Sequence, residues 1–206
     1  MDKLVINFID DIGIYSYDEI LFNQGITTLI GRNGSGKTTL LRHVRDFCRE
    51  HKIPCFSYSN FDEGGANAQK QNLYSGNIDM FAGAMLNSEG MNISMNFACK
   101  AREIGGAIRK AIDEGASKFV LLLDALDSGA SINVIREMKS FFKVIEKDNN
   151  DKLQVYIINA SNSYEFAKGQ RCIDVIDGEE INFKSYEDYS KFICKARRSK
   201  NERSNS

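Results

Sequence analysis

Short apolar runs alternate along this chain with longer stretches in which apolar residues recur every three or four positions. The runs predict β-strands, and the recurrence predicts helices with one buried face. The expected strands are Leu4–Ile9, a weaker one within Ile14–Phe22, Thr27–Ile30, Cys55–Tyr58, Phe119–Asp124, Leu153–Ile158, and a closing hairpin of Ile173–Ile176 with Ile181–Phe183.

Two apolar stripes mark the longest expected helices, one over Ile93–Ile112 and one over Ile132–Ile145. Another helix should end near Lys52, because Pro54 cannot continue it. Strands that alternate with helices predict an α/β fold with a mostly parallel central sheet. Shorter helices are expected at Ile78–Leu86 and Glu187–Lys195.

The stretch Gly31–Thr38, with the sequence G-R-N-G-S-G-K-T, lies between an expected strand and an expected helix, which is the context that a phosphate loop requires. Its glycines let backbone N–H groups surround a phosphate chain, and the helix N-terminus adds further donors. Lys37 would reach the β- and γ-phosphates, and Thr38 would hold Mg²⁺. The chain is therefore expected to bind a nucleoside triphosphate. The predicted contacts are Gly31, Asn33, Gly34, Ser35, Gly36, Lys37, Thr38 and Thr39.

Composition narrows the class of protein. Of the 206 residues, 42% are hydrophobic and 27% are charged, which is usual for a soluble domain. The net charge of −1 gives no general attraction to nucleic acid or to membranes. No apolar run approaches the roughly 20 residues that a membrane span needs, and no signal-peptide pattern is present. Five dispersed cysteines and two histidines favour reduced thiols over a metal or disulfide framework, so we expect a cytoplasmic protein without membrane insertion.

The most apolar run, Phe119–Asp124, predicts a strand buried on both faces that ends in an acid. In P-loop proteins a carboxylate at the end of such a strand completes the Mg²⁺ shell as the Walker B residue. Because hard cations prefer oxygen ligands, Asp124 and Thr38 are the predicted metal residues.

Taken together, the stretches Gly31–Leu41, Ser88–Gly90 and Leu121–Gly129 resemble the ABC-type ATPase superfamily, most closely its soluble RecF/Rad50/SMC-like branch. Asn33 within the loop is typical of that branch. The likeness covers about Leu4 to Phe183 and implies ATP as the nucleotide. The expected fold is a P-loop NTPase fold of the ABC-ATPase head type, over residues 1–185, with a short helix and a basic polar tail in residues 186–206.

The resemblance also implies a homodimer in which two chains enclose ATP. Ser88 and Gly90 would then be signature residues that touch the γ-phosphate held by the other chain, although Glu89 replaces the glycine of many relatives. Asp127, Ser128 and Gly129 would form the loop that crosses the dimer interface. These signature and interface contacts are implied only by the resemblance to the family.

Two departures from the family concern catalysis. Ala125 occupies the position of the usual water-activating glutamate, and Asn162 is the nearest equivalent of the usual γ-phosphate histidine. An amide hydrogen-bonds a phosphate but carries no charge. Asp127 is the nearest acid that could replace the glutamate, so the expected catalytic residues are Asp124, Asp127 and Asn162.

Several assignments stay open at the level of sequence. The glutamine-loop position falls on Asn60 or Asp62 as readily as on a glutamine of the polar segment 60–77, which is long enough to be a functional loop. Tyr15 or Tyr17 either stacks on adenine or is a buried strand residue. Arg32 either contacts the nucleotide or is solvated. The C-terminal basic cluster either touches DNA phosphate or is a plain solvated tail.

The expected function is that of an ATP-binding protein, with slow ATPase activity, that dimerises around ATP and acts with a partner protein or DNA. One alternative is an ATP-dependent dimerisation switch without hydrolysis, which Ala125 favours. A small P-loop kinase is the other alternative, but Ser131–Lys152 contains one arginine where a kinase lid needs several.

Overall fold

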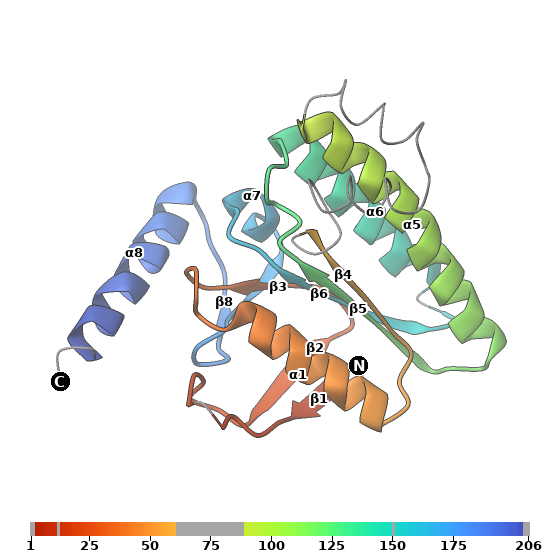
Figure 1. Ribbon diagram of the computed structural model, residues 1–206, viewed down its shortest axis with the longest axis horizontal. Coiled ribbons are helices and arrows are strands. Elements are labelled where there is room, and N and C mark those ends of the chain that lie inside the picture. Colours follow the sequence, from red (N-terminus) through yellow and green to blue (C-terminus); the bar gives the residue numbers. More distant parts are fainter. Residues whose placement is uncertain (1–2, 12, 61–88, 150, 204–206) are drawn as a thin grey trace, which may run out of the picture.

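A six-stranded sheet lies at the centre of the fold, with helices on both of its faces (Figure 1). The structure is a computed structural model that describes residues 3–11, 13–60, 89–149 and 151–203, without the side chains of 89–96 and 196–203. The strand order is β4-β5-β6-β3-β7-β8, and every pair in it is parallel except β7 with β8. The strands are β3 Gly25–Ile30, β4 Cys55–Ser59, β5 Lys118–Asp124, β6 Gln154–Ala160, β7 Arg171–Asp174 and β8 Glu180–Ile181. The predicted α/β fold with a mostly parallel sheet is confirmed.

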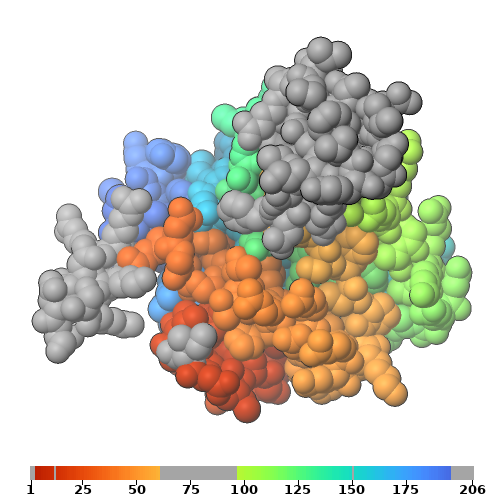
Figure 2. All heavy atoms as spheres, in the orientation of Figure 1, coloured from red at the N-terminus to blue at the C-terminus, as the bar shows by residue number. Residues whose placement is uncertain are grey.

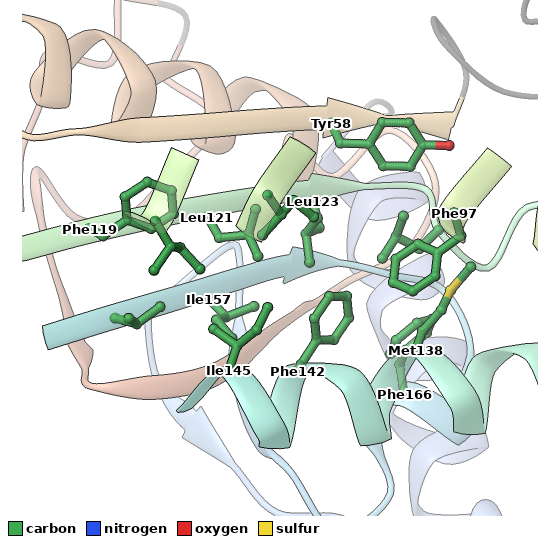
Figure 3. Close-up of a cluster of buried hydrophobic side chains, with 14 of the residues drawn as sticks. Tyr58, Phe97, Phe119, Leu121, Leu123, Met138, Phe142, Ile145, Ile157 and Phe166 are labelled. Carbon is green, nitrogen blue, oxygen red and sulfur yellow. The ribbon is translucent and has the colours of Figure 1, made fainter. Parts of the chain in front are cut away.

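Strand β5 is buried on both faces, as its sequence predicts. Phe119, Leu121 and Leu123 pack against α5 (Glu89–Asp113) and α6 (Ile132–Asn149), which carry the two predicted apolar stripes (Figure 3). Val120 and Leu122 point to the opposite face. Burial of apolar surface contributes about 25 cal/mol per Å² to the free energy of folding. Burial on both faces therefore stabilises the position of the strand that ends in Asp124.

The opposite face of the sheet is covered by α1 (Lys37–Glu50) and by an antiparallel hairpin of β1 (Lys3–Asn7) and β2 (Glu19–Asn23). Leu40, Val44 and Cys48 of α1 are fully buried there, at the helical spacing of four residues. In Figure 2 the hairpin and α1, coloured red and orange, form the lower part of the visible surface. Helix α1 ends slightly before the predicted Lys52, and Pro54 follows it.

The C-terminal region adds two further helices to the fold. The short helix α7 (Tyr164–Ala167), which the sequence analysis did not predict, begins where the Ser163 hydroxyl accepts a hydrogen bond from the Glu165 N–H. The predicted helix at Glu187–Lys195 is present within a longer helix, α8 (Tyr186–Arg203). The predicted helix Ile78–Leu86 and most of the segment 60–77 lie outside the described residues.

Candidate functional site

The phosphate loop connects β3 to α1 and leaves the first turn of α1 open. Its last residue before the helix, Gly36, has φ +94° and is the N-cap, with no side chain bonded to the helix end. A Cβ at Gly36 would lie 2.8 Å from Ile14 Cγ2, so only glycine fits both the conformation and the space. The first amide groups of α1 therefore keep their donors available for an anion.

Lys37 folds back over the loop that precedes it. Its ammonium group donates to the carbonyl oxygens of Gly31 and Arg32, at 2.7 and 3.0 Å. Burial lowers the Lys37 pKa to about 8, although the carboxylates of Asp127 and Asp124 nearby act in the opposite direction. The side chain is only 9% exposed, so its charge lies within the loop rather than in bulk solvent.

Thr38 and Asp124 meet even though β6 separates the strands that precede them. The Thr38 hydroxyl donates to Asp124 Oδ2 at 2.8 Å. A hydroxyl and a carboxylate at this distance are the oxygen donors that suit Mg²⁺, so the residues present fit the expected ion. No group of three or more His, Cys, Asp and Glu side chains that could hold a metal gathers in the described ranges.

The other predicted loop residues divide into exposed and buried ones. Asn33 and Gly34 are exposed, and Thr39 is half-buried in the first turn of α1. The Ser35 hydroxyl is buried and has no hydrogen-bond partner among the described residues. Gly31 gives it room, because a Cβ there would lie 2.5 Å from Ser35 Oγ.

The side-chain hydroxyls of Tyr15 and Tyr17 both form hydrogen bonds with backbone carbonyl groups. The Tyr15 hydroxyl donates to the Gly36 carbonyl at 2.7 Å, and the Tyr17 hydroxyl donates to the Val175 carbonyl at 2.9 Å. Burial raises the pKa of both phenols, which therefore stay protonated as donors. These contacts favour the reading of both tyrosines as structural residues, with Tyr15 bracing the end of the phosphate loop.

Beside the phosphate loop lies a second group of predicted site residues, in the loops that follow β5 and β6. We call residues 125–129 the β5 loop and residues 161–163 the β6 loop. The Asn162 N–H donates to Asp127 Oδ2 at 2.9 Å, and Asn60 Nδ2 donates to the Ser128 carbonyl at 2.9 Å. The structure thus brings Asp124, Asp127 and Asn162 to one end of the sheet, next to Lys37.

Ala125, which occupies the position of the expected glutamate, has φ +54° and is 8% exposed. Its N–H donates to the Ala160 carbonyl at 3.1 Å, and its carbonyl accepts from the Ser128 N–H at 3.0 Å. A non-glycine residue in the left-handed region is strained by about 1–2 kcal/mol. The β5 loop therefore begins with a strained, buried residue at the end of the sheet that carries the candidate site.

The predicted signature residues are only partly within the described chain. Ser88 lies outside the described residues, and Gly90 lies in the first turn of α5, which begins at Glu89. Asp62 is also outside, whereas Asn60, another candidate for the glutamine-loop position, directly follows β4 and donates a hydrogen bond to the β5 loop.

Sequence reasoning missed one residue that contacts the site. Tyr189 of α8 donates its hydroxyl to the Asn162 carbonyl at 2.6 Å. The contact joins residues 27 positions apart and ends on a backbone oxygen, so no local sequence pattern announces it.

A separate groove of about 850 Å³ lies between the hairpin and α1. None of its lining residues belongs to the phosphate loop, the β5 loop or the β6 loop, so it is distinct from this site. The residues lining it are Asn7, Phe8, Ile9, Asp11, Asp18, Glu19, His43, Asp46, Phe47 and Glu50.

Comparison with known proteins agrees with the phosphate-loop half of the site. A family model described as an AAA domain matches residues 8–50, from just after β1 to the end of α1. No curated protein matches the sequence. Among the helices of the described ranges, none has the length and apolar character needed to cross a membrane. The match and the mostly parallel sheet together identify a nucleotide-binding domain with the P-loop NTPase fold.

Proposed function

We propose that this protein binds ATP with Mg²⁺, forms a nucleotide-dependent homodimer of the ABC-ATPase head type and hydrolyses ATP slowly while acting with a partner protein or DNA. The observation that carries the proposal is the 2.8 Å contact between the Thr38 hydroxyl and Asp124 at the uncapped end of α1. It joins a metal-binding pair to a cluster of amide donors, which is the combination that a magnesium-bound triphosphate requires.

Lys37 supports the binding of the phosphates. Its ammonium group donates hydrogen bonds to the carbonyl oxygens of Gly31 and Arg32. Phosphate oxygens carry full negative charge and are stronger acceptors than carbonyl oxygens, so Lys37 would exchange these bonds for contacts with the β- and γ-phosphates. When bound, Mg²⁺ would supply positive charge that offsets the charge developing on the phosphate oxygens.

Slow hydrolysis follows from the groups that remain at the γ-phosphate end of the site. The exposed side-chain amide of Asn162 can hydrogen-bond a phosphate oxygen or a water molecule. Asp127 is the nearest acid, but its carboxylate already accepts the Asn162 N–H. Since one oxygen of Asp127 is engaged and Ala125 has no polar side chain, the attacking water would be poorly positioned.

A switch that does not hydrolyse ATP is the second candidate, and Ala125 is the observation that favours it. The residue is buried and its backbone is bonded on both sides, so this position offers no acid to activate water. A kinase is disfavoured because Arg136, the one arginine of Ser131–Lys152, lies on α6 and is paired with Glu165 at 2.9 Å.

Replacing Ala125 with glutamate separates the two candidates. We expect Ala125→Glu to raise the single-turnover rate of ATP hydrolysis by about tenfold or more, because a carboxylate would again be able to orient water. Ala125→Gly is the matched control, since it suits the left-handed backbone and adds no acid. A rate that stays flat in Ala125→Glu while ATP still binds would favour the switch.

The proposed dimer rests on the family likeness of Ser88 and Gly90, since one chain cannot bring its own signature to its own phosphate loop. Two-fold pairing would place nucleotide in the interface, so ATP should favour the dimer by mass action. We expect sedimentation to show a dimer with ATP–Mg²⁺ and a monomer without it. Ser88→Arg should block pairing and leave ATP binding intact. A chain that stays monomeric at saturating ATP, or a Ser88→Arg variant that dimerises, would contradict the sandwich.

A further inference from the structure

Among the described side chains of the C-terminal helix α8, Tyr189 makes the polar contact that reaches the nucleotide site. Tyr189, in the first turns of α8, donates its hydroxyl to the Asn162 carbonyl at 2.6 Å. The Asn162 N–H in turn donates to Asp127 at 2.9 Å. The backbone of Asn162 is therefore held on both sides, on one by an acid of the β5 loop and on the other by a phenol of α8.

The side chain of Asn162 contrasts with its backbone. It is exposed, and its amide makes no hydrogen bond within the described part of the chain. A residue that is fixed at both backbone groups and open at its side chain is suited to present that side chain to a ligand in one orientation. Preorganisation of this kind lowers the entropy lost when the ligand binds.

Tyr189 is itself tightly placed. Its side chain is 6% exposed and packs with Ile30, Ala167 and Cys172, between α8 and the sheet. Phe183 meets its ring edge-on, with centroids 5.2 Å apart. Burial, with Asp127 nearby, raises the pKa of the phenol to about 12, so the hydroxyl stays a donor at neutral pH.

We propose that Tyr189 is a positioning residue through which the docking of α8 sets the orientation of Asn162, and thereby the affinity of the site for ATP. This rests on the proposed function, in which Asn162 faces the γ-phosphate. The helix is then a regulatory element of the site: whatever displaces α8 releases the Asn162 carbonyl and loosens the Asn162–Asp127 contact. Because coupling between sites is reciprocal, ATP should also stabilise the docked state of α8.

The test uses Tyr189→Phe, which removes the hydroxyl and keeps the ring. Tyr186→Phe is the matched control on the same helix, since Tyr186 is 64% exposed and its hydroxyl has no hydrogen bond in the described structure. Hydrogen exchange of the β6 loop is measured first, without nucleotide. We expect exchange to be about fivefold faster in Tyr189→Phe and unchanged in Tyr186→Phe, the size expected for one lost hydrogen bond.

Calorimetry with ATP–Mg²⁺ then tests the coupling. We expect affinity to fall by about three- to tenfold in Tyr189→Phe only. We also expect ATP to slow exchange in α8 of the wild type but not of Tyr189→Phe. Equal exchange in the β6 loop of Tyr189→Phe and wild type overturns the proposal whether or not the protein binds ATP. Faster exchange with unchanged ATP affinity also overturns it, because Tyr189 would then be merely structural. A wild-type protein that binds no ATP refutes the proposed function and, with it, the coupling between α8 and ATP binding. The exchange experiment tests the contact between Tyr189 and Asn162 independently of ATP.

Discussion

The two halves of the candidate site are built in different ways. The phosphate loop lies between β3 and α1, which are neighbours in the chain, and its shape is set by glycines within eight residues, 31–38. The other half consists of the β5 and β6 loops, which are held by hydrogen bonds from Asn60 and from Tyr189. A half made from consecutive residues depends on local backbone geometry, whereas a half made from distant ones depends on the docking of whole elements.

Removal of the Lys37 charge should have the largest effect on the half of the site that the phosphate loop forms, which we call the local half. We expect Lys37→Ala to reduce ATP–Mg²⁺ affinity by at least about 100-fold, because it removes a buried charge-assisted contact with the phosphates. Calorimetry measures the affinity, and circular dichroism checks the fold. Lys147→Ala, at an exposed position of α6, is the control. Unchanged affinity in a natively folded Lys37→Ala protein would refute the assignment of the phosphate loop.

The pH dependence of ATP binding is a second test of Lys37 in the local half of the site. Burial lowers the pKa of Lys37 to about 8, and bound phosphates would keep the ammonium group protonated. Binding then takes up a proton above pH 8, so ATP affinity should fall as the pH rises, by up to about tenfold per unit. Calorimetry in buffers of different ionisation enthalpy should detect almost one proton taken up at pH 9 and far less at pH 7. An uptake that is equal at both values would contradict the low pKa.

The smallest expected effect is on the free energy of unfolding, and it concerns two residues with strained backbones, one near each half of the site. Lys52, just after α1, and Ala125 both have φ +54°, but Lys52 is exposed and Ala125 is buried. Lys52→Gly should raise the free energy of unfolding by about 0.5–1 kcal/mol, because glycine relieves the strain.

At Ala125 the same substitution should gain less, since the lost burial of one methyl group costs about 0.8 kcal/mol. Urea unfolding of both glycine variants measures the difference. An Ala125→Gly gain larger than that of Lys52→Gly would mean that the β5 loop stores more strain than its backbone angle suggests.

The sequence predicts the local half of the site almost completely. Strand β3, the loop and α1 are adjacent, so the motif and its context lie in one stretch of chain. Asp124 is also predictable, because an apolar run long enough for a buried strand ends in an acid. Residues 8–50, which the family model matches, cover this half but not Asp124.

The distant half could be predicted only in part. Asp127 and Asn162 are recognisable by their positions after strands, but their mutual hydrogen bond is not. The contact of Asn60 with Ser128 and that of Tyr189 with Asn162 end on backbone carbonyl groups, and every residue has one. Helix α7 was missed although Ser163 and Glu165 form a usual helix start, because it is only four residues long.

The position of β6 between β3 and β5 has a consequence for where the chain can change in length. The Ala160 carbonyl accepts the Ala125 N–H at 3.1 Å, and the Ser161 N–H donates to the Leu29 carbonyl at 3.4 Å. The end of β6 is therefore hydrogen-bonded both to the strand before the phosphate loop and to the start of the β5 loop. One residue inserted there would shift the phosphate loop and the β5 loop relative to each other. An insertion in the exposed turn at Glu114–Gly115 would leave both in register, so natural variation in length should be found in such turns and not at the end of β6.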